Sequence, residues 1–179
     1  MLVEGMSDQA AVETLARRRG RNLAAESVAI VAMGGATNLG HYLERFGPRG
    51  IGVRLAGLCD AAEEDSFRRG LEKAGLGSNI TRPDMEDLGF YVCEADLEDE
   101  LIRALGTSAV EAIIETQREH VAFRSFQRQP AQRGRPLEAQ LRRFMGTLSG
   151  RKIRYGHLMV EALDLSRVPP PLDGVLDRV

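Results

Sequence analysis

The sequence predicts an α/β fold in which a mostly parallel sheet carries helices on both faces, followed by a part made of helices alone. Two observations predict it. Short apolar runs alternate with segments of helical apolar spacing along the first hundred residues, and that alternation forces parallel strands joined by right-handed crossovers. Beyond them the apolar spacing is helical. A chain of 179 residues has the length of one domain, with room for a small appendage.

Four strands are expected, because each is a short apolar run that ends at a glycine or a carboxylate. The clearest is VAIVAM, a run of the kind found in buried parallel strands. The four strands are predicted at 1–4, 28–33, 51–59 and 90–93. Helices are predicted between them at 8–19, 38–46 and 61–74, and 77–83 is expected to be loop.

The last third of the chain is predicted to be helical and basic. Helices are expected at 97–105, 107–117, 118–129, 137–145 and 152–163. The tail at 168–172 (VPPPL) is expected to be neither helix nor central strand, because proline lacks the N–H that both need. We therefore divide the chain into an α/β domain at 1–117 and a basic helical C-terminal extension at 118–179, packed on it.

The composition excludes several classes of protein. Apolar residues make up 43% of the chain and charged residues 28%, which is a globular profile and excludes disorder of the whole chain. The two cysteines, Cys59 and Cys93, sit in apolar runs and are expected to be reduced and buried, which excludes a disulfide scaffold. No apolar run approaches the ~20 residues of a membrane span. The expected location is the cytoplasm, with no membrane partner.

The charge is divided unevenly along the chain. The segment 60–100 holds 13 acidic and 4 basic residues, and 118–154 holds 10 basic and 2 acidic residues. Such a division suits cations at one place and polyanions at another. The alternative is a set of solvated helix faces, and the position of the charges has to decide.

Carboxylates follow three of the four predicted strands. In an open parallel sheet, ligands bind beyond the carboxyl ends of the strands. Carboxylates gathered there without balancing bases repel one another, and a hard divalent cation such as Mg²⁺ would resolve the repulsion. The alternative is that acidic residues near helix starts only cap the helices, which is worth about 0.3–1 kcal/mol each. The acidic residues concerned are Glu4, Asp8, Asp60, Glu94, Asp96 and Glu98.

The run at 2–8 (LVEGMSD) resembles the first motif of Toprim domains, a glutamate at the end of the first strand followed by glycine. Its EGxSD form is similar to the Toprim domain of the OLD family (overcoming lysogenisation defect), which are ATP-dependent endonucleases. Asp60 sits where that family carries a D-x-D motif. Asp96-Leu97-Glu98 resembles the next acidic motif, and 149–152 (SGRK) the distal lysine region. The resemblance implies a Toprim-like (Rossmann-like) fold with a central parallel four-stranded sheet and a helical C-terminal extension.

The same resemblance implies a metal-dependent nuclease, a hydrolase that cleaves phosphodiester bonds of DNA with Mg²⁺ or Mn²⁺. One ion would activate a water and the other would stabilise the leaving oxygen. Glu4, Asp8 and Asp60 would hold the first ion and Glu98 the second. Glu4 would also serve catalysis, and Lys152 would neutralise charge that builds on the phosphate. Without the resemblance, Lys152 is an ordinary surface lysine in a basic stretch.

Two departures from the family pattern keep a second function open. The second aspartate of D-x-D falls on Ala62, so Glu63 or Glu64 substitutes for it, metal affinity is reduced, or the site is degenerate. The chain also lacks the G-x-x-x-x-G-K-[ST] sequence of an ATPase. It is either a stand-alone Toprim protein or a piece of a larger one, with an ATPase partner or a homo-oligomer as possible assemblies. The alternative function is a degenerate Toprim module that binds nucleic acid or a partner ATPase without cleaving. A receiver-like or nucleotide-binding domain fits less well, because a receiver needs paired acids after the first strand.

The glycine pair after the second predicted strand is a weaker candidate. Gly34 and Gly35 precede a predicted helix, where backbone N–H groups can bind phosphate. The alternative is a tight turn.

Overall fold

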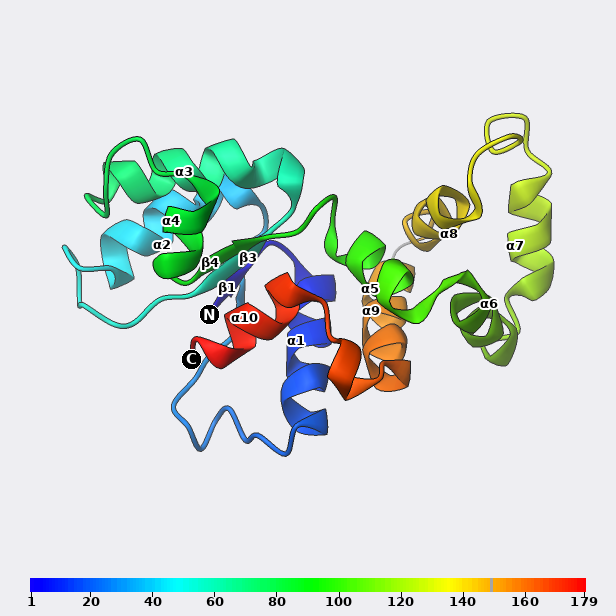
Figure 1. The fold of residues 1–179 in the computed structure, drawn as a ribbon, viewed down its shortest axis with the longest axis horizontal. Coiled ribbons are helices and arrows are strands. Elements are labelled where there is room, and N and C mark those ends of the chain that lie inside the picture. The colour runs from blue at the N-terminus through cyan, green and yellow to red at the C-terminus, as the bar shows by residue number, and fades with distance from the viewer. Residues whose placement is uncertain (149) are drawn as a thin grey trace.

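A short parallel sheet lies at the centre of the N-terminal part of the molecule (Figure 1). This computed structural model describes residues 1–148 and 150–179. The strands are β1 (Leu2–Val3), β2 (Val31–Ala32), β3 (Gly57–Cys59) and β4 (Phe90–Val92), in the order β2-β1-β3-β4 and parallel throughout. The predicted four-stranded parallel sheet is therefore confirmed.

Helices cover both faces of the sheet, because successive strand residues point to opposite sides. Val3 and Leu58 pack with α1 (Met6–Arg18) and α10 (Pro170–Asp177). Leu2, Cys59 and Phe90 point the other way, into a second apolar cluster. That cluster is covered by α2 (Leu39–Phe46), α3 (Glu64–Lys73) and α4 (Arg82–Asp87). Short 3₁₀ turns complete this part at η1 (Ala36–Asn38), η2 (Ala61–Glu63) and η3 (Leu165–Arg167).

The remaining helices extend the molecule away from the sheet (Figure 1). They are α5 (Leu97–Leu105), α6 (Thr107–Thr116), α7 (His120–Gln127), α8 (Leu137–Met145) and α9 (Arg151–Ala162). The α9 helix returns to lie along α1. The two helices pass closely at Gly156, where a Cβ would come within 3.2 Å of the Ser7 carbonyl oxygen. The C-terminal part is thereby joined to the helix that starts beside Glu4.

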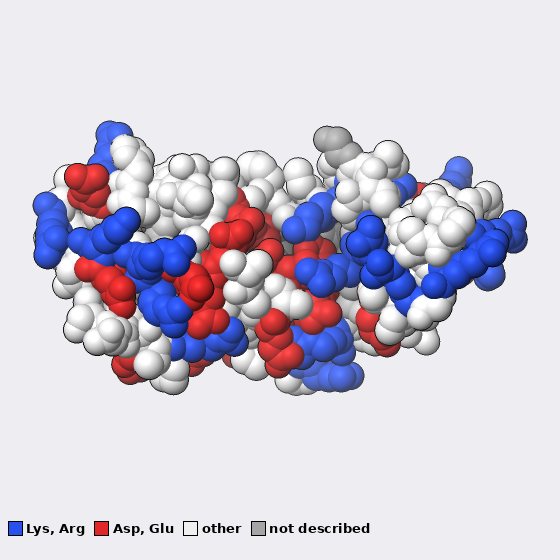
Figure 2. Space-filling model, turned by 90° about the horizontal axis from the view of Figure 1, so that it is seen from above, with Lys and Arg blue, Asp and Glu red and all other residues white. Residues whose placement is uncertain are grey.

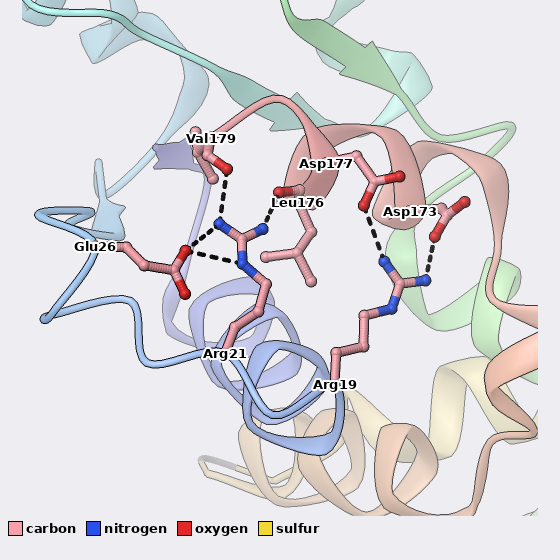
Figure 3. A network of polar contacts seen from close by, with 7 residues as sticks. All are labelled: Arg19, Arg21, Glu26, Asp173, Leu176, Asp177 and Val179. Carbon is pink, nitrogen blue, oxygen red and sulfur yellow. Dashed lines mark hydrogen bonds and ion pairs between the residues drawn. The ribbon is translucent and has the colours of Figure 1, made fainter.

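The last helix is fastened to the far end of α1 by arginines (Figure 3). Arg19 contacts the carboxylates of Asp173 and Asp177, both on α10. Arg21 donates to the backbone oxygens of Leu176 and Val179, at 2.5 and 2.7 Å, and pairs with Glu26. Residues near positions 20 and 175 are thus held together by charge as well as by the core.

Three local expectations are wrong. The VPPPL tail does form a helix, α10, because a proline at the first turn removes an N–H that has no intrahelical acceptor. The expected strand at 51–59 shrinks to the three residues that pair with β4, and Ile51 is left 69% exposed. A helix was also missed at α4, although Thr81 and Asp84 form the reciprocal capping contacts that mark a helix start.

Two expectations from composition can be compared with the coordinates. Both cysteines are free and buried, as expected. None of the helices within 1–148 and 150–179 has the length and apolar character to cross a bilayer.

Candidate active site at the carboxyl ends of the strands

Glu4 and Asp60 leave neighbouring strands at the same edge of the sheet. Glu4 follows β1 and Asp60 follows β3, and these strands pair in parallel. Asp8 lies in the first turn of α1, and Glu98 in the first turn of α5. Figure 2 shows a face of the molecule with acidic side chains gathered in its middle and basic side chains on either side. The fold thus brings together residues that are up to 94 positions apart in the sequence.

The backbone carbonyl of Glu4 is hydrogen-bonded, whereas one oxygen of its side chain has no partner within the described residues. Its carbonyl oxygen accepts hydrogen bonds from the N–H groups of Gly34 and Gly35, at 3.1 and 3.2 Å. One carboxylate oxygen, Oε2, is shielded from solvent and has no hydrogen-bond partner within the described residues. Burial raises the pKa of Glu4, and the charges of Asp8 and Glu63 raise it further. A shielded carboxylate oxygen without a partner is what an oxygen-seeking cation would satisfy.

The same contacts correct the glycine hypothesis. Since the N–H groups of Gly34 and Gly35 already donate to Glu4, they are not free to bind a phosphate. Both glycines have positive φ, 74° and 124°, which the turn requires. The pair forms a tight turn that fixes the end of β1.

Asp8 has a capping role and also belongs to the acidic group. Its carboxylate accepts from the Gly5 N–H at 2.8 Å, which satisfies one of the open donors at the start of α1. The residue is buried, at 8% exposed. Burial raises the pKa of Asp8, while the Gly5 hydrogen bond and Lys152 oppose the rise. The capping interpretation of Asp8 is therefore real, and it places the carboxylate beside Glu4.

Asp60 has the most strongly perturbed titration of this group. Its side chain takes part in no hydrogen bond or ion pair within the described residues. Burial raises its pKa to about 7, helped by the charges of Asp8, Glu4 and Asp96. A carboxyl whose ionised form is this unfavourable is typical of a functional position.

Glu98 and Lys152 form an ion pair. The Lys152 Nζ lies 2.9 Å from Glu98 Oε2, without the alignment of a good hydrogen bond. Burial raises the pKa of Glu98 to about 7, against the effect of Lys152. Burial lowers the pKa of Lys152, but Glu98, Asp8 and Asp60 outweigh it and keep the amine protonated. Ser149, the start of the expected lysine motif, lies outside the described residues.

Other carboxylates near the strand ends are engaged elsewhere. Asp96 caps α5 by accepting from the Asp99 N–H at 2.9 Å, and it pairs with Arg142 at 2.5 Å. Glu94 points outward and pairs with Arg103. Fewer carboxylates at this edge are therefore without a basic partner than the sequence spacing alone indicates.

The contacts of Glu63 and Glu64 show which of them could replace the carboxylate that is missing at Ala62. Ala62 is exposed, and Glu64 pairs with Arg82 at 2.5 Å. Glu63 makes no such pair within the described residues, and its charge acts on Glu4. Of the two alternatives, Glu63 is therefore the one that is unpaired within the described residues and whose charge acts on Glu4. No sequence signal pointed to Arg142, because its partner Asp96 lies 46 positions away.

The donors suit a hard divalent cation in kind, since they are carboxylate oxygens of which one is shielded and without a partner. These carboxylates do not lie close enough together to coordinate one ion. Across 1–148 and 150–179, no three His, Cys, Asp or Glu side chains are grouped closely enough to hold an ion as they stand. Ionised carboxylates at this edge repel one another, and a cation between them would remove that repulsion.

The basic segment reaches the acidic edge through its helices. Both α8 and α9 pack against α5, and they carry Arg142 and Lys152 to it. Further along, Arg151 and Arg154 are engaged by Glu119. Several other arginines are exposed and form no ion pair within the described residues: Arg118, Arg124, Arg128, Arg133, Arg135 and Arg143.

Comparison with known proteins places this site in a family context. Residues 1–61 match the family described as overcoming lysogenization defect protein-like, TOPRIM domain. No curated protein matches the sequence. Among solved structures, the chain is similar to the C-terminal region of the Burkholderia pseudomallei OLD protein, at 18% identity and a TM-score of 0.75, covering 99% of this chain and 94% of that one. It is also similar to the C-terminal region of the Xanthomonas campestris pv. campestris OLD protein, at 21% identity and a TM-score of 0.76, covering 99% and 89%. Residues 1–61 therefore resemble the Toprim domain of OLD-like proteins, and the chain has the fold of the C-terminal regions of two OLD proteins.

Proposed function

We propose that this protein is a metal-dependent nuclease module that hydrolyses phosphodiester bonds of DNA. One observation carries the proposal: Glu4 ends β1 with a shielded carboxylate oxygen that has no partner in the described part of the chain, and the charges of Glu4 and Asp8 raise the pKa of nearby Asp60. Toprim domains as a class bind divalent metal ions, and the donor types here fit such an ion. The proposal includes the cytoplasmic location expected from the sequence.

Each residue has a distinct role in this proposal. Glu4, Asp8 and Asp60 would hold one Mg²⁺ or Mn²⁺, and Glu98 would serve a second. A bound ion of this type supplies Lewis-acid activation of water and stabilisation of the leaving oxygen. Glu4, whose pKa is raised, is placed to accept or return a proton during hydrolysis. Lys152 would meet the negative charge that builds on the phosphate.

The exposed arginines support DNA as the polyanion. Six of them lie on or beside α7 and α8 without an ion-pair partner among the described residues. Arginine recognises phosphate well because its planar donors match phosphate oxygens. We propose that these side chains guide DNA toward the acidic edge. A separate ATPase or a second copy of the chain would be the partner that controls this access.

A second function is favoured by specific observations. Ala62 removes a carboxylate, the remaining donors are not converged, and Glu98 is already paired with Lys152. These features also suit a degenerate Toprim module that binds nucleic acid or a partner ATPase without cleaving it.

Nicking of supercoiled plasmid separates the two functions. The chain is incubated with plasmid in Mg²⁺, in Mn²⁺ and in EDTA, and the open circular form is measured over time. The nuclease proposal expects nicking with either metal and none with EDTA. DNA binding without any nicking would favour the degenerate module.

Two glutamates at strand ends provide a matched pair for this experiment. Glu4→Gln removes the charge at the shielded position, and Glu94→Gln removes the charge of an exposed glutamate after β4 that pairs with Arg103. We expect nicking to be lost in Glu4→Gln and kept in Glu94→Gln. Equal loss in both variants would contradict the placement of the site.

A further inference from the structure

The ion pair between Glu98 and Lys152 blocks the role given to Glu98. Its side chain is 2% exposed, and its Oε2 atom is shielded from solvent. The cation beside that atom is the Lys152 ammonium, 2.9 Å away. A divalent cation that binds this oxygen of Glu98 would lie next to the ammonium, and repulsion between the two cations would favour departure of the ammonium.

We propose that Lys152 occupies the place of the second cation beside Glu98 and that a divalent cation displaces it toward the phosphate. The inference rests on the proposed function. It adds an order of events: Lys152 is unavailable to substrate while the protein is metal-free, and it becomes available when the second ion binds. Metal loading and phosphate contact are then coupled through one side chain.

Neighbouring cations are not free to take over this position. Arg142 is paired with Asp96, and both Arg151 and Arg154 are paired with Glu119. The Lys152 side chain is also able to move away from Glu98. It lies in the first turn of α9, is 42% exposed, and has a flexible four-carbon stem that can swing without moving the helix.

Other carboxylates near Lys152 can attract its ammonium group after it leaves Glu98. Its charge acts on Asp8 and Asp60 as well as on Glu98. Those carboxylates belong to the group that would hold the first ion. A displaced ammonium would therefore remain attracted to these carboxylates and stay near a phosphate bound by the ions.

The chain offers a direct test, because Lys73 and Lys152 are its two lysines. Acylation of each amine is followed by mass spectrometry in EDTA and in Mg²⁺ at constant ionic strength. Lys73 is exposed near the end of α3 and serves as the internal control. We expect Lys152 to react more slowly than Lys73 in EDTA. Mg²⁺ should speed Lys152 about tenfold, as one unit of lowered pKa would, and leave Lys73 unchanged.

Two variants sharpen the test. In Glu98→Gln, Lys152 loses its partner and should react quickly in EDTA as well. Lys152→Met should bind Mn²⁺ about tenfold more tightly in calorimetry, since no ammonium competes. Arg154→Met, which removes a cation from the same helix that pairs with Glu119, should bind Mn²⁺ as the unmodified chain does.

The outcomes distinguish this inference from the proposed function. Mg²⁺ that binds by calorimetry but leaves the reactivity of Lys152 unchanged would overturn the displacement and leave the nuclease proposal intact. A gain in Mn²⁺ affinity that is equal in Lys152→Met and Arg154→Met would show a general charge effect and would also overturn it. No binding of Mg²⁺ or Mn²⁺ at all would contradict both proposals.

Discussion

The two ends of α1 carry opposite charges, and they differ in whether those charges are paired with partners of opposite sign. At the C-terminal end, Arg19 has two aspartate partners on α10, and Arg21 has Glu26 and two backbone oxygens (Figure 3). At the N-terminal end, the charge of Asp8 raises the pKa of Glu4, and the charges of Asp8 and Glu4 raise the pKa of Asp60. Acidic residues at a helix start and basic ones at its end both suit the helix dipole. The difference is that one end is neutralised by partners and the other is left with excess negative charge.

The paired charges at one end stabilise the folded protein, whereas the unbalanced charges at the other end destabilise it. The arginines of the far end fasten the last helix, so their loss should weaken the protein. The carboxylates of the near end repel one another in a partly buried place, so their loss should strengthen it and remove activity. The largest expected effect is therefore on catalysis, at the near end.

Asp60→Asn should abolish cleavage and stabilise the metal-free protein. The substitution removes a ligand of the proposed first ion, and losses of at least about a hundredfold are usual when such an electrostatic contributor is removed. It also removes a charge whose ionisation is unfavourable in the fold. The measurements are the rate of plasmid nicking and the melting temperature in EDTA at about pH 8. A variant that melts lower than the unmodified chain would contradict the account.

The stability of the metal-free protein should fall as the pH rises toward 7 and above. Asp60 and Glu98 have pKa values of about 7 in the fold, against ordinary values of 3.8 and 4.5. The folded state thus holds these protons more tightly than the unfolded chain does. Their contribution is complete below about pH 4 and is lost as the pH passes about 7.

Denaturant unfolding in EDTA at several pH values measures this dependence. We expect a loss on the order of several kcal/mol between about pH 5 and pH 8, because each of the two groups holds its proton in the folded state alone over about two pH units of that range. Asp60→Asn should reduce the slope, and Mg²⁺ at the higher pH should restore stability by binding the ionised carboxylates. An identical slope in the variant would show that Asp60 does not titrate in this range.

Arg19→Ala should lower stability and leave the site unaffected. The side chain joins the end of α1 to two aspartates of α10, and its guanidinium is mostly buried. A cost of about 1–2 kcal/mol is expected for breaking such a double contact. Denaturant unfolding gives the cost, and the Mn²⁺ affinity by calorimetry serves as the control. Weaker Mn²⁺ binding in this variant would mean that the two ends are not independent.

Ala62→Asp should have a smaller effect, an increase in metal affinity and in nicking of several-fold. It restores a carboxylate beside Asp60 at an exposed position. The matched variant is Glu63→Gln, which should lower the Mg²⁺ affinity if Glu63 serves in place of the missing aspartate. If a silent chain stays silent in Ala62→Asp, position 62 is not the missing ligand and the degenerate module gains support. Full activity of the unmodified chain in Mg²⁺ would instead indicate that Glu63 already fills the role.

The sequence was sufficient for the sheet and for the first acidic motif. Apolar runs and their alternation with helices are local signals, and LVEGMSD places Glu4 and Asp8 a single helical turn apart. The lengths of the strands were not predictable, because they depend on which residues find a partner on the neighbouring strands, as the three residues of β3 do on β4. The helix at α10 was missed because the prolines were considered without their place at a helix start.

The partners of the site residues were beyond the sequence. Lys152 and Glu98 are 54 positions apart, and Asp96 and Arg142 are 46 apart, so helix packing alone brings them together. The burial that raises the pKa values of Asp60 and Glu98 is likewise a property of the packed fold. The division into 1–117 and 118–179, and the roles of Glu4, Asp8, Asp60, Glu98 and Lys152, stay predictions.

The central claim is that the carboxyl ends of β1 and β3 hold a divalent cation. Crystals of the chain soaked in Mn²⁺ test it most directly, because manganese gives an anomalous signal that locates the ion. The account predicts a peak bound by oxygens of Glu4, Asp8 and Asp60, at the distances usual for such cations, about 2.0–2.6 Å. No peak at saturating Mn²⁺, or a peak held by Glu94 and Asp99 instead, would contradict it.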